Sequence, residues 1–430
     1  MTVAEVRLWG RRIGAISWDS SQELASFEYD AEFQRSAIEV APVQMPLGSR
    51  IYQFPELPER SFRGLPGMLA DSLPDRFGNA LIDAWLARQG RSRSSFDPVQ
   101  RLCYVGARGM GALEYAPAAG PDTEEGELEV AALVALADAV LRERESLDTT
   151  LGKDPAAINQ ILQVGTSAGG ARAKAIIAFN PDSGEVRSGH LPAATGFSHW
   201  ILKLDGVRSV LEREVGTTLG YGRIEYAYSL MAHRAGIRMS ECRLLEEGER
   251  AHFMTRRFDR SESGQKLHLQ SLAAIGHYDF NAAGECSQEE AIAIMRRLEL
   301  PAPELAEHYR RICFNLMARN QDDHVKNIAF LMDKRGQWSL SPAYDLTWAY
   351  NPEGAWTSTH QMTVNGKRDD FTHADLLEFG KVCDLRSGRA KAVINEVATA
   401  IADWPQLAAD AGVPPEQASQ MQAYFRRDLV

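Results

Sequence analysis

Apolar and polar positions along the first part of the chain follow the spacings of regular elements. They alternate over residues 3–9 and again over 13–18, on either side of a glycine turn, which predicts a β-hairpin. Apolar runs at 27–29 and 37–43 are expected to extend this sheet. After two proline-containing turns, the pattern changes to the helical period and predicts a helix at about 77–88. The chain is therefore expected to open with a β-rich unit.

A second block follows residues 116–129, which combine proline, glycine and acidic residues as a surface linker does. A helix rich in alanine and leucine is predicted at 128–144. Beyond it the pattern predicts a strand ending at residue 179, a strand at 200–204, a helix at 223–235 and a hairpin of 242–245 with 252–255.

The last part begins with an amphipathic helix whose apolar residues recur every three or four positions up to Met317. A short apolar strand is predicted at 328–332. Between them lies a loop with two carboxylates, an imidazole, an ammonium and a carboxamide, which packing of a helix against a strand does not require. Further helices are predicted at 374–379, 389–401 and 415–425.

Composition narrows the class of protein. The 430 residues are 44% hydrophobic and 24% charged, as in ordinary globular proteins. A formal net charge of −11 argues against a broad nucleic-acid-binding surface. Five scattered cysteines without metal-ligand spacing are typical of reduced thiols in a cytosolic protein. The N-terminus lacks the apolar core of a signal peptide, and no apolar run would span a bilayer, so we expect a soluble, cytoplasmic protein.

A glycine-rich stretch precedes the strand that ends at residue 179. Backbone N–H groups of such a stretch can point into one concavity that suits phosphate oxygens, although an ordinary turn has the same composition. The candidate nucleotide-binding residues here are Gly165, Thr166, Ser167, Gly169 and Gly170.

Two charged residues further along support a nucleotide site. Lys203 stands in an apolar strand, where burying it is expensive unless an anion meets it, and Glu225 lies early in the following helix. Protein kinases hold nucleotide phosphates with such a lysine–glutamate pair. Glu212 and Glu214 compete for the glutamate role, and an exposed edge strand would explain the lysine equally well.

Residues 256–260 stand where the two lobes of a kinase are connected, so Arg257 and Phe258 are expected near the adenine. The alternative for this segment is a surface cluster of ion pairs, each worth about 0–1 kcal/mol.

The polar loop has the spacing of a kinase catalytic loop. Asp322 and Asn327 are five residues apart, as in H-R-D-x-x-x-x-N, where the aspartate is the base and the asparagine binds Mg²⁺. Lys326 would neutralise phosphate charge, and Asp345, after the next hairpin, falls where the second Mg²⁺ ligand is expected. A rival interpretation makes Asp322, Asp345 and their neighbours Asp323 and His324 a hydrolytic zinc or manganese centre.

With these motifs the chain resembles the HipA family of serine/threonine kinase toxins over nearly its whole length. The matching segments are Phe62-Arg63-Gly64-Leu65-Pro66, Leu73-Pro74-Asp75, the stretch from Gly165 to Lys174, Arg257-Phe258-Asp259-Arg260, the loop from Asp322 to Asn327, and Ser341-Pro342-Ala343-Tyr344-Asp345.

The resemblance implies an α+β, two-lobed protein-kinase-like fold with a β-rich N-terminal subdomain and a mostly helical C-terminal lobe. We expect the N-terminal subdomain at 1–120, where an antitoxin or another partner would bind. The N-lobe-like region is expected at 121–258 and the catalytic lobe at 259–430.

The same resemblance implies ATP and Mg²⁺ as cofactors and assigns roles to residues. Asp322 would be the base, Asn327 and Asp345 the metal ligands, Lys203 the phosphate-binding lysine and Phe258 an adenine contact. Ser167 matches the family's autophosphorylated serine, with Thr166 as an alternative. Asp323 departs from the family, which commonly has a small residue there; it would repel substrate or face water. His324 is expected to brace the loop.

The family also implies partners: a helix-turn-helix antitoxin like HipB, DNA reached through that antitoxin, and a protein substrate such as an aminoacyl-tRNA synthetase. Two alternatives stay open from the residues alone. One is a catalytically silent, antitoxin-binding corepressor module, and the other is a small-molecule phosphotransferase.

Overall fold

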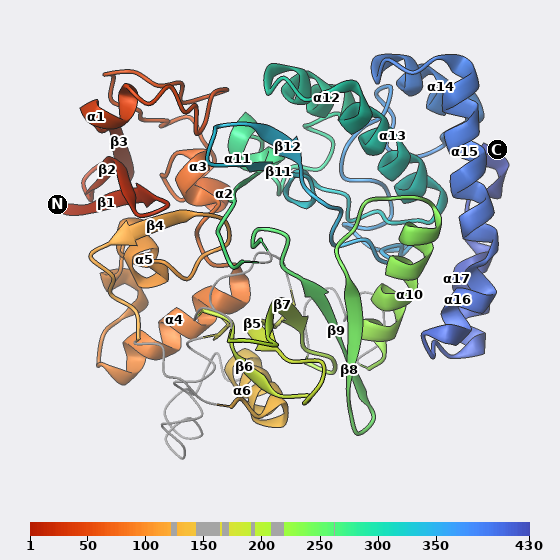
Figure 1. The fold of residues 1–430 in the computed structure, drawn as a ribbon, viewed down its shortest axis with the longest axis horizontal. Helices are drawn as coiled ribbons and strands as arrows, with labels where there is room; N and C mark the ends of the chain where they lie inside the picture. The colour runs from red at the N-terminus through yellow and green to blue at the C-terminus, as the bar shows by residue number, and fades with distance from the viewer. Residues whose placement is uncertain (122–126, 143–163, 166–171, 191–193, 208–218, 262) are drawn as a thin grey trace.

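The computed structural model describes residues 1–121, 127–142, 164–165, 172–190, 194–207, 219–261 and 263–430. Its elements gather in three parts that follow the order of the chain (Figure 1). The N-terminal part is coloured red to orange, the middle part yellow to green, and the C-terminal part teal to blue. No helix in the described part of the chain is long and apolar enough to cross a lipid bilayer.

The N-terminal part is a four-stranded sheet in the order β3-β2-β1-β4, with short helices around it. The predicted hairpin is confirmed as β1 and β2, which pair antiparallel. Residues 37–43 form no strand, so that prediction was wrong. The segment is irregular, and its Val40 and Ala41 are buried in the core of the N-terminal part. The elements are β1 Thr2–Leu8, β2 Arg11–Asp19, β3 Leu24–Tyr29, α1 Ala31–Gln34, α2 Glu59–Phe62, α3 Gly67–Ala70, α4 Arg76–Arg88, η1 Arg93–Ser95, α5 Pro98–Val105 and β4 Leu113–Ala116.

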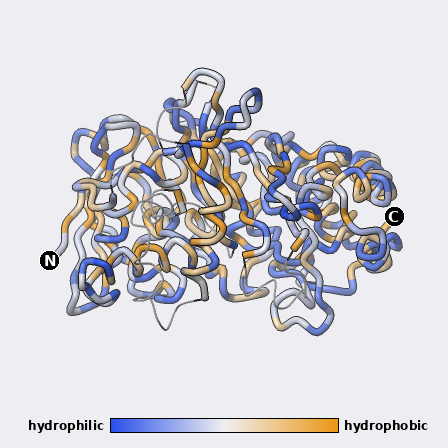
Figure 2. Tube along the Cα trace, turned by 90° about the horizontal axis from the view of Figure 1, so that it is seen from below, coloured by the Kyte–Doolittle hydropathy of each residue, from blue (hydrophilic) through white to orange (hydrophobic). Residues whose placement is uncertain are grey.

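The middle part is a five-stranded antiparallel sheet in the order β6-β5-β7-β9-β8, with α10 packed against β8 and β9. Every residue of β5 is buried, and Figure 2 shows mostly hydrophobic residues along strands near the centre of the molecule. The predicted strands, helices and hairpin of this region are all present. The elements are α6 Val130–Arg142, β5 Lys174–Phe179, β6 Val186–Ser188, β7 Ser198–Lys203, α10 Tyr221–Arg234, β8 Cys242–Glu247 and β9 Arg250–Arg256.

The C-terminal part is mostly helical and carries one small sheet, β10-β11-β12. The predicted helix and strand around the polar loop are confirmed as α13 and β11. The elements are β10 His268–Ser271, α11 Leu272–Gly276, α12 Gln288–Arg297, α13 Ala302–Met317, η2 Val325–Asn327, β11 Ala329–Met332, β12 Trp338–Leu340, α14 His373–Val382, α15 Ser387–Ala402, α16 Trp404–Asp410, α17 Pro415–Ala423 and η3 Arg427–Leu429.

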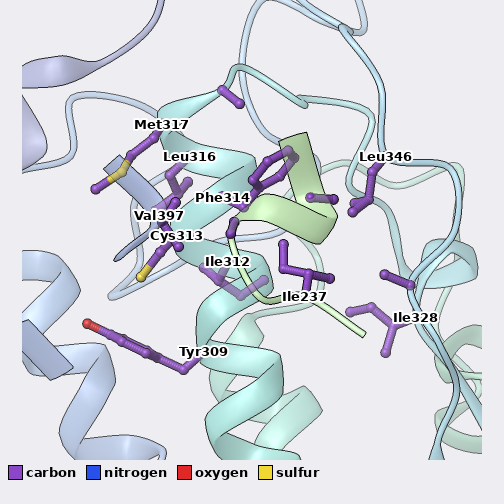
Figure 3. Close-up of a cluster of buried hydrophobic side chains, with 14 of the residues drawn as sticks. Ile237, Tyr309, Ile312, Cys313, Phe314, Leu316, Met317, Ile328, Leu346 and Val397 are labelled. Atoms are coloured by element: carbon purple, nitrogen blue, oxygen red, sulfur yellow. The ribbon is translucent and has the colours of Figure 1, made fainter. Parts of the chain in front are cut away.

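Helix α13 runs through the core of this part, so the loop that follows it starts from a fixed point. Figure 3 shows its apolar side chains near Val397 of α15, Ile237 just after α10, Ile328 just before β11 and Leu346 shortly after β12. Because all these side chains are buried, moving α13 would disrupt the packing of several elements at once.

The N-terminal part is tied to the C-terminal part by hydrogen bonds from the turns at 58–71. The carboxylate of Asp71 accepts bonds from the backbone N–H and the hydroxyl of Ser271, at 2.7 and 2.8 Å. The backbone N–H of Gly67 donates to Nε2 of His277 at 3.1 Å. These contacts dock the N-terminal part on the C-terminal part.

Candidate active site

One cavity of about 1100 Å³ opens where the three parts meet. It is lined by every predicted site residue that the structure describes except Gly165: Lys203, Glu225, Arg257, Phe258, Asp322, Lys326, Asn327 and Asp345. Thr166, Ser167, Gly169 and Gly170 lie outside the described residues. The N-terminal part forms one wall of the cavity through residues of α4 and of the turn before it.

Lys203, the last residue of β7, lies between two carboxylates in the cavity. Its ammonium donates hydrogen bonds to Glu225 of α10 and to Asp345, which comes from the C-terminal part. Glu225 is completely buried, whereas the competing Glu212 and Glu214 lie outside the described residues. Burial alone would lower the pKa of Lys203, but the carboxylates of Asp345 and Glu225 raise it above its ordinary value. The lysine is therefore charged.

Asp345 has a backbone φ of 53°, in the left-handed region that non-glycine residues rarely adopt. Burial would raise the pKa of its carboxyl group, but Lys203 and Lys174 hold that pKa below its ordinary value. Asp345 therefore combines a left-handed backbone with an ionised, partly exposed carboxylate in the cavity, a combination that occurs at functional sites.

The loop after α13 is held in shape by its own backbone and by Trp356. The amide nitrogen of Asn327 donates to the backbone carbonyl of Asp322 at 2.7 Å, and this bond closes the loop between the two residues. The indole N–H of Trp356 donates to Oδ1 of Asp322 at 2.7 Å. The ring of His324 accepts from the backbone N–H of Lys326 at 3.3 Å, so it braces the loop as expected.

The carboxyl group of Asp322 lies partly exposed in the cavity. Burial raises its pKa above the ordinary value, with Asp345 and Asp323 adding to the rise, while His324 and the hydrogen bond from Trp356 oppose it. A carboxylate with a raised pKa that faces a cavity is a better proton acceptor than one on the surface.

Asp323 points away from the cavity, so both expectations for it were wrong. It is 6% exposed, and its carboxylate accepts from the backbone N–H of Gln361 at 2.7 Å and contacts Nδ1 of His360 at 2.8 Å. It anchors the loop to the C-terminal part and neither repels substrate nor faces water.

The geometry does not support the rival zinc or manganese centre. In the described part of the chain, no three His, Cys, Asp or Glu side chains converge as metal ligands.

Arg257 and Asp259 of the segment between the lobes are buried, which excludes the surface ion-pair alternative. The guanidinium of Arg257 donates to both carboxylate oxygens of Asp259, at 2.9 and 2.7 Å, and Arg260 donates to the same carboxylate at 2.8 Å. The ring of Phe258 lies 5.6 Å from that of Tyr344, between centroids. Of the two predicted adenine contacts, only Phe258 keeps its side chain uncommitted to this ion-pair cluster.

The cavity lining also includes Arg172, Lys174 and Asp75, which were not among the predicted site residues. Arg172 lies two residues before β5, and Lys174 is the first residue of β5, directly opposite Lys203 in the sheet register. Asp75, the N-cap of α4, places Oδ2 3.9 Å from the Lys174 ammonium. Burial raises the pKa of Asp75 to about 6. The signal for Lys174 was the same as for Lys203, a lysine in an apolar strand.

Asn327 and Asp345 fit the chemistry of a magnesium site. The amide nitrogen of Asn327 is engaged with Asp322, which leaves its carbonyl oxygen as the donor atom for a cation. Asp345 uses one carboxylate oxygen for Lys203 and has a second. Hard oxygen donors, few in number, are what Mg²⁺ takes from a protein when phosphate and water complete its shell.

Comparison with known proteins adds to this geometry. Residues 166–404 match the family model of the HipA-like C-terminal domain, and residues 4–116 match that of the HipA N-terminal domain. No curated protein sequence matches the chain.

Two solved structures are similar to different extents. The HipA, HipB and operator DNA complex of the Shewanella oneidensis MR-1 toxin–antitoxin system contains a chain that aligns with a TM-score of 0.67 and 17% identity, over 99% of this chain and 95% of that one. The proinflammatory kinase CtkA of Helicobacter pylori aligns with a TM-score of 0.34 and 10% identity, over 54% of this chain and 89% of that one, which is too low to support an argument. The first likeness confirms the predicted fold class.

Proposed function

Since this chain belongs to the HipA family, we propose that it is an ATP- and Mg²⁺-dependent serine/threonine protein kinase and the toxin of a toxin–antitoxin pair. The observation that carries the proposal is the position of Lys203, bonded to both Glu225 and Asp345 in the cavity that also holds Asp322 and Asn327. Kinases use these five residue types, in this chain order, to hold a nucleotide and activate a hydroxyl.

Each residue has a role that its surroundings support. Lys203 would contact the phosphates, Asn327 and Asp345 would hold Mg²⁺, and Asp322 would accept the proton of the attacking hydroxyl. Bound ATP and Mg²⁺ would supply the transferable phosphoryl group and neutralise its charge. Lys326 belongs to the same loop, and its ammonium lies 4.4 Å from the centroid of the Phe280 ring. From there it would contribute positive charge at the transferred group.

A phosphate-transfer assay tests the activity. Purified protein incubated with ATP and Mg²⁺ should gain phosphate on Ser167, with Thr166 as the alternative acceptor, as peptide mass spectrometry would show. A phosphate there adds about −1.5 to −2 charges beside a site for ATP's own phosphates, so the modified protein should bind ATP more weakly. Transfer only to small molecules would favour the phosphotransferase alternative, and no ATP binding at all would favour the silent corepressor module.

The proposed partners are a helix-turn-helix antitoxin like HipB and, through it, DNA. The similar Shewanella oneidensis structure contains HipA, HipB and operator DNA, and the acidity of this chain suits a toxin that leaves DNA contacts to its antitoxin. Gel-shift assays test this: the chain alone should leave operator DNA unshifted, and it should supershift an antitoxin–DNA complex.

The proposed acceptor is a serine of a host protein such as an aminoacyl-tRNA synthetase. A panel of purified synthetases, incubated with the kinase, ATP and Mg²⁺, would identify it by mass increase and by loss of tRNA charging. The Asp322→Asn variant is the matched control, because any phosphorylation that it still gives comes from a contaminating kinase.

A further inference from the structure

Glu225 has a cation opposite each of its carboxylate oxygens. Lys203 of β7 binds Oε1, and Nη1 of Arg172 lies 3.7 Å from Oε2. Oε2 makes no hydrogen bond to any described residue, and Glu225 is completely buried. Lys203 pairs with the buried charge, and Arg172 places a second cation beside the oxygen that has no hydrogen bond of its own.

Arg172 also contacts the first residue of α10. Its guanidinium lies 3.2 Å from the ring centroid of Tyr221, and the Tyr221 hydroxyl donates to the backbone carbonyl of Trp348 in the C-terminal part. The Arg172 side chain is 14% exposed and lines the cavity. It therefore joins the strand side of the cavity to the helix side through two contacts, one electrostatic and one over an aromatic ring.

The start of α10 depends on such contacts. Its N-cap is Gly220, with φ of 88°, and no side chain caps the first turn. Glycine at an N-cap supplies no side-chain acceptor for the free N–H groups of that turn. The start of α10 is held instead by contacts from outside the helix. The Gly220 backbone N–H donates to the carboxylate of Asp205 at 3.1 Å, and Arg172 contacts both Tyr221 and Glu225.

Arg172 stands two residues before Lys174, which pairs in register with Lys203. We infer that Arg172 is a positioning residue of the nucleotide site: it occupies the second oxygen of Glu225 and fixes the first turn of α10, so that Lys203 stays extended toward Asp345. This inference rests on the proposed function, in which Lys203 contacts ATP phosphates. Without Arg172, the uncompensated Oε2 draws the Lys203 ammonium toward Glu225 and away from the phosphates.

ATP binding in the presence of Mg²⁺, measured by calorimetry, tests the inference without catalysis. Arg172→Gln should weaken ATP binding about tenfold, because it removes both the ion pair and the ring contact. Arg172→Lys keeps the charge and should recover part of the affinity. The matched control is Arg187→Gln, which removes an exposed arginine of β6 that pairs with Glu185 but does not line the cavity; its affinity should equal that of the unmodified protein.

Tyr221 provides a second route that leaves the charges untouched. Tyr221→Leu removes the ring under the guanidinium, while Tyr221→Phe keeps the ring and loses the hydrogen bond to Trp348. We expect Leu to weaken ATP binding and Phe to leave it within about twofold. Combining Tyr221→Leu with Arg172→Lys should be no worse than the poorer single variant, because both remove the same contact. If Arg172→Gln does not fold, this comparison decides.

Kinetics separate positioning from general destabilisation. Arg172→Gln should raise KM for ATP more than it lowers kcat, because bound phosphates restore the orientation of Lys203. Failure of the unmodified protein to bind ATP would overturn the proposed function itself. If the unmodified protein binds ATP, then equal affinity in Arg172→Gln, or a lowered melting temperature with unchanged ATP affinity, would overturn only the role of Arg172.

Discussion

Replacing Asp259 with asparagine would test whether the segment between the lobes is held by a buried ion-pair cluster. Asp259 is fully buried and accepts hydrogen bonds from Arg257, Arg260 and the backbone N–H of Gly111, the last at 2.7 Å. Asparagine keeps a side-chain oxygen for Gly111 but removes the negative charge. Two guanidinium groups, one completely and one almost completely buried, would then have lost their carboxylate.

The expected loss is large because the cluster is buried. Removing one partner of a buried ion pair typically costs about 3–5 kcal/mol. The unfolding entropy of a chain of this length is about 0.9 kcal/mol per kelvin near the melting temperature, so the melting temperature should fall by about 3–6 °C. An exposed ion pair is worth about 0–1 kcal/mol, or about 1 °C at most on the same basis.

The matched control is Asp333→Asn. Asp333 pairs with Arg335 at 2.9 Å, but the Arg335 side chain is 77% exposed, and asparagine keeps the acceptor for the turn that both residues form. Differential scanning calorimetry at one scan rate compares the two variants with the unmodified protein. If Asp259→Asn melts within about 1 °C of Asp333→Asn, the buried cluster does not hold the lobes together as described.

Two further substitutions test how the N-terminal part meets the rest. Burial raises the pKa of Asp75 to about 6, above its unfolded value, so its contribution to stability is present at low pH and is lost as the pH rises through about 6. Melting temperatures from pH 4 to 7 should therefore fall more steeply in the unmodified protein than in Asp75→Asn, and parallel curves would contradict this. A Cβ on Gly67 would lie 2.3 Å from the carbonyl oxygen of Ala274, so Gly67→Ala should destabilise the protein by about 1–3 kcal/mol, whereas Gly388→Ala, in open space, should not; equal unfolding midpoints would refute the close docking.

The sequence pattern predicted an element correctly where its apolar residues recur with the period of a helix or strand and are also the buried ones. Helix α13 and strand β11 are buried along the positions that the apolar spacing indicated, and the loop between them was identified because its polarity had no packing explanation. Lys203 was identified by the same reasoning, a charge in an apolar strand. Three glutamates were candidates for the partner of Lys203, and the structure shows the hydrogen bond to Glu225.

What could not be predicted depends on partners far away in sequence. The inward direction of Asp323 is set by His360 and Gln361, nearly forty residues on, so its sequence neighbours in the loop carry no sign of it. Residues 37–43 have as many apolar residues as a strand, but these side chains are buried although the segment does not pair with a strand of the sheet. Helix α16 was not predicted because it is short and has only two buried residues, Trp404 and Ala408, which are too few to show a helical period in the sequence.

The central claim is that Asp322 is a base in an ATP site, and one measurement tests it most directly. The rate of phosphate transfer from ATP, in the presence of Mg²⁺, is compared between the unmodified protein and Asp322→Asn, with ATP affinity measured on the same samples. Asparagine keeps the acceptor for the Trp356 N–H, so the loop should hold and ATP should still bind. The account predicts a rate lower by about 10²–10⁴ with affinity nearly unchanged. An unchanged rate in Asp322→Asn would contradict it.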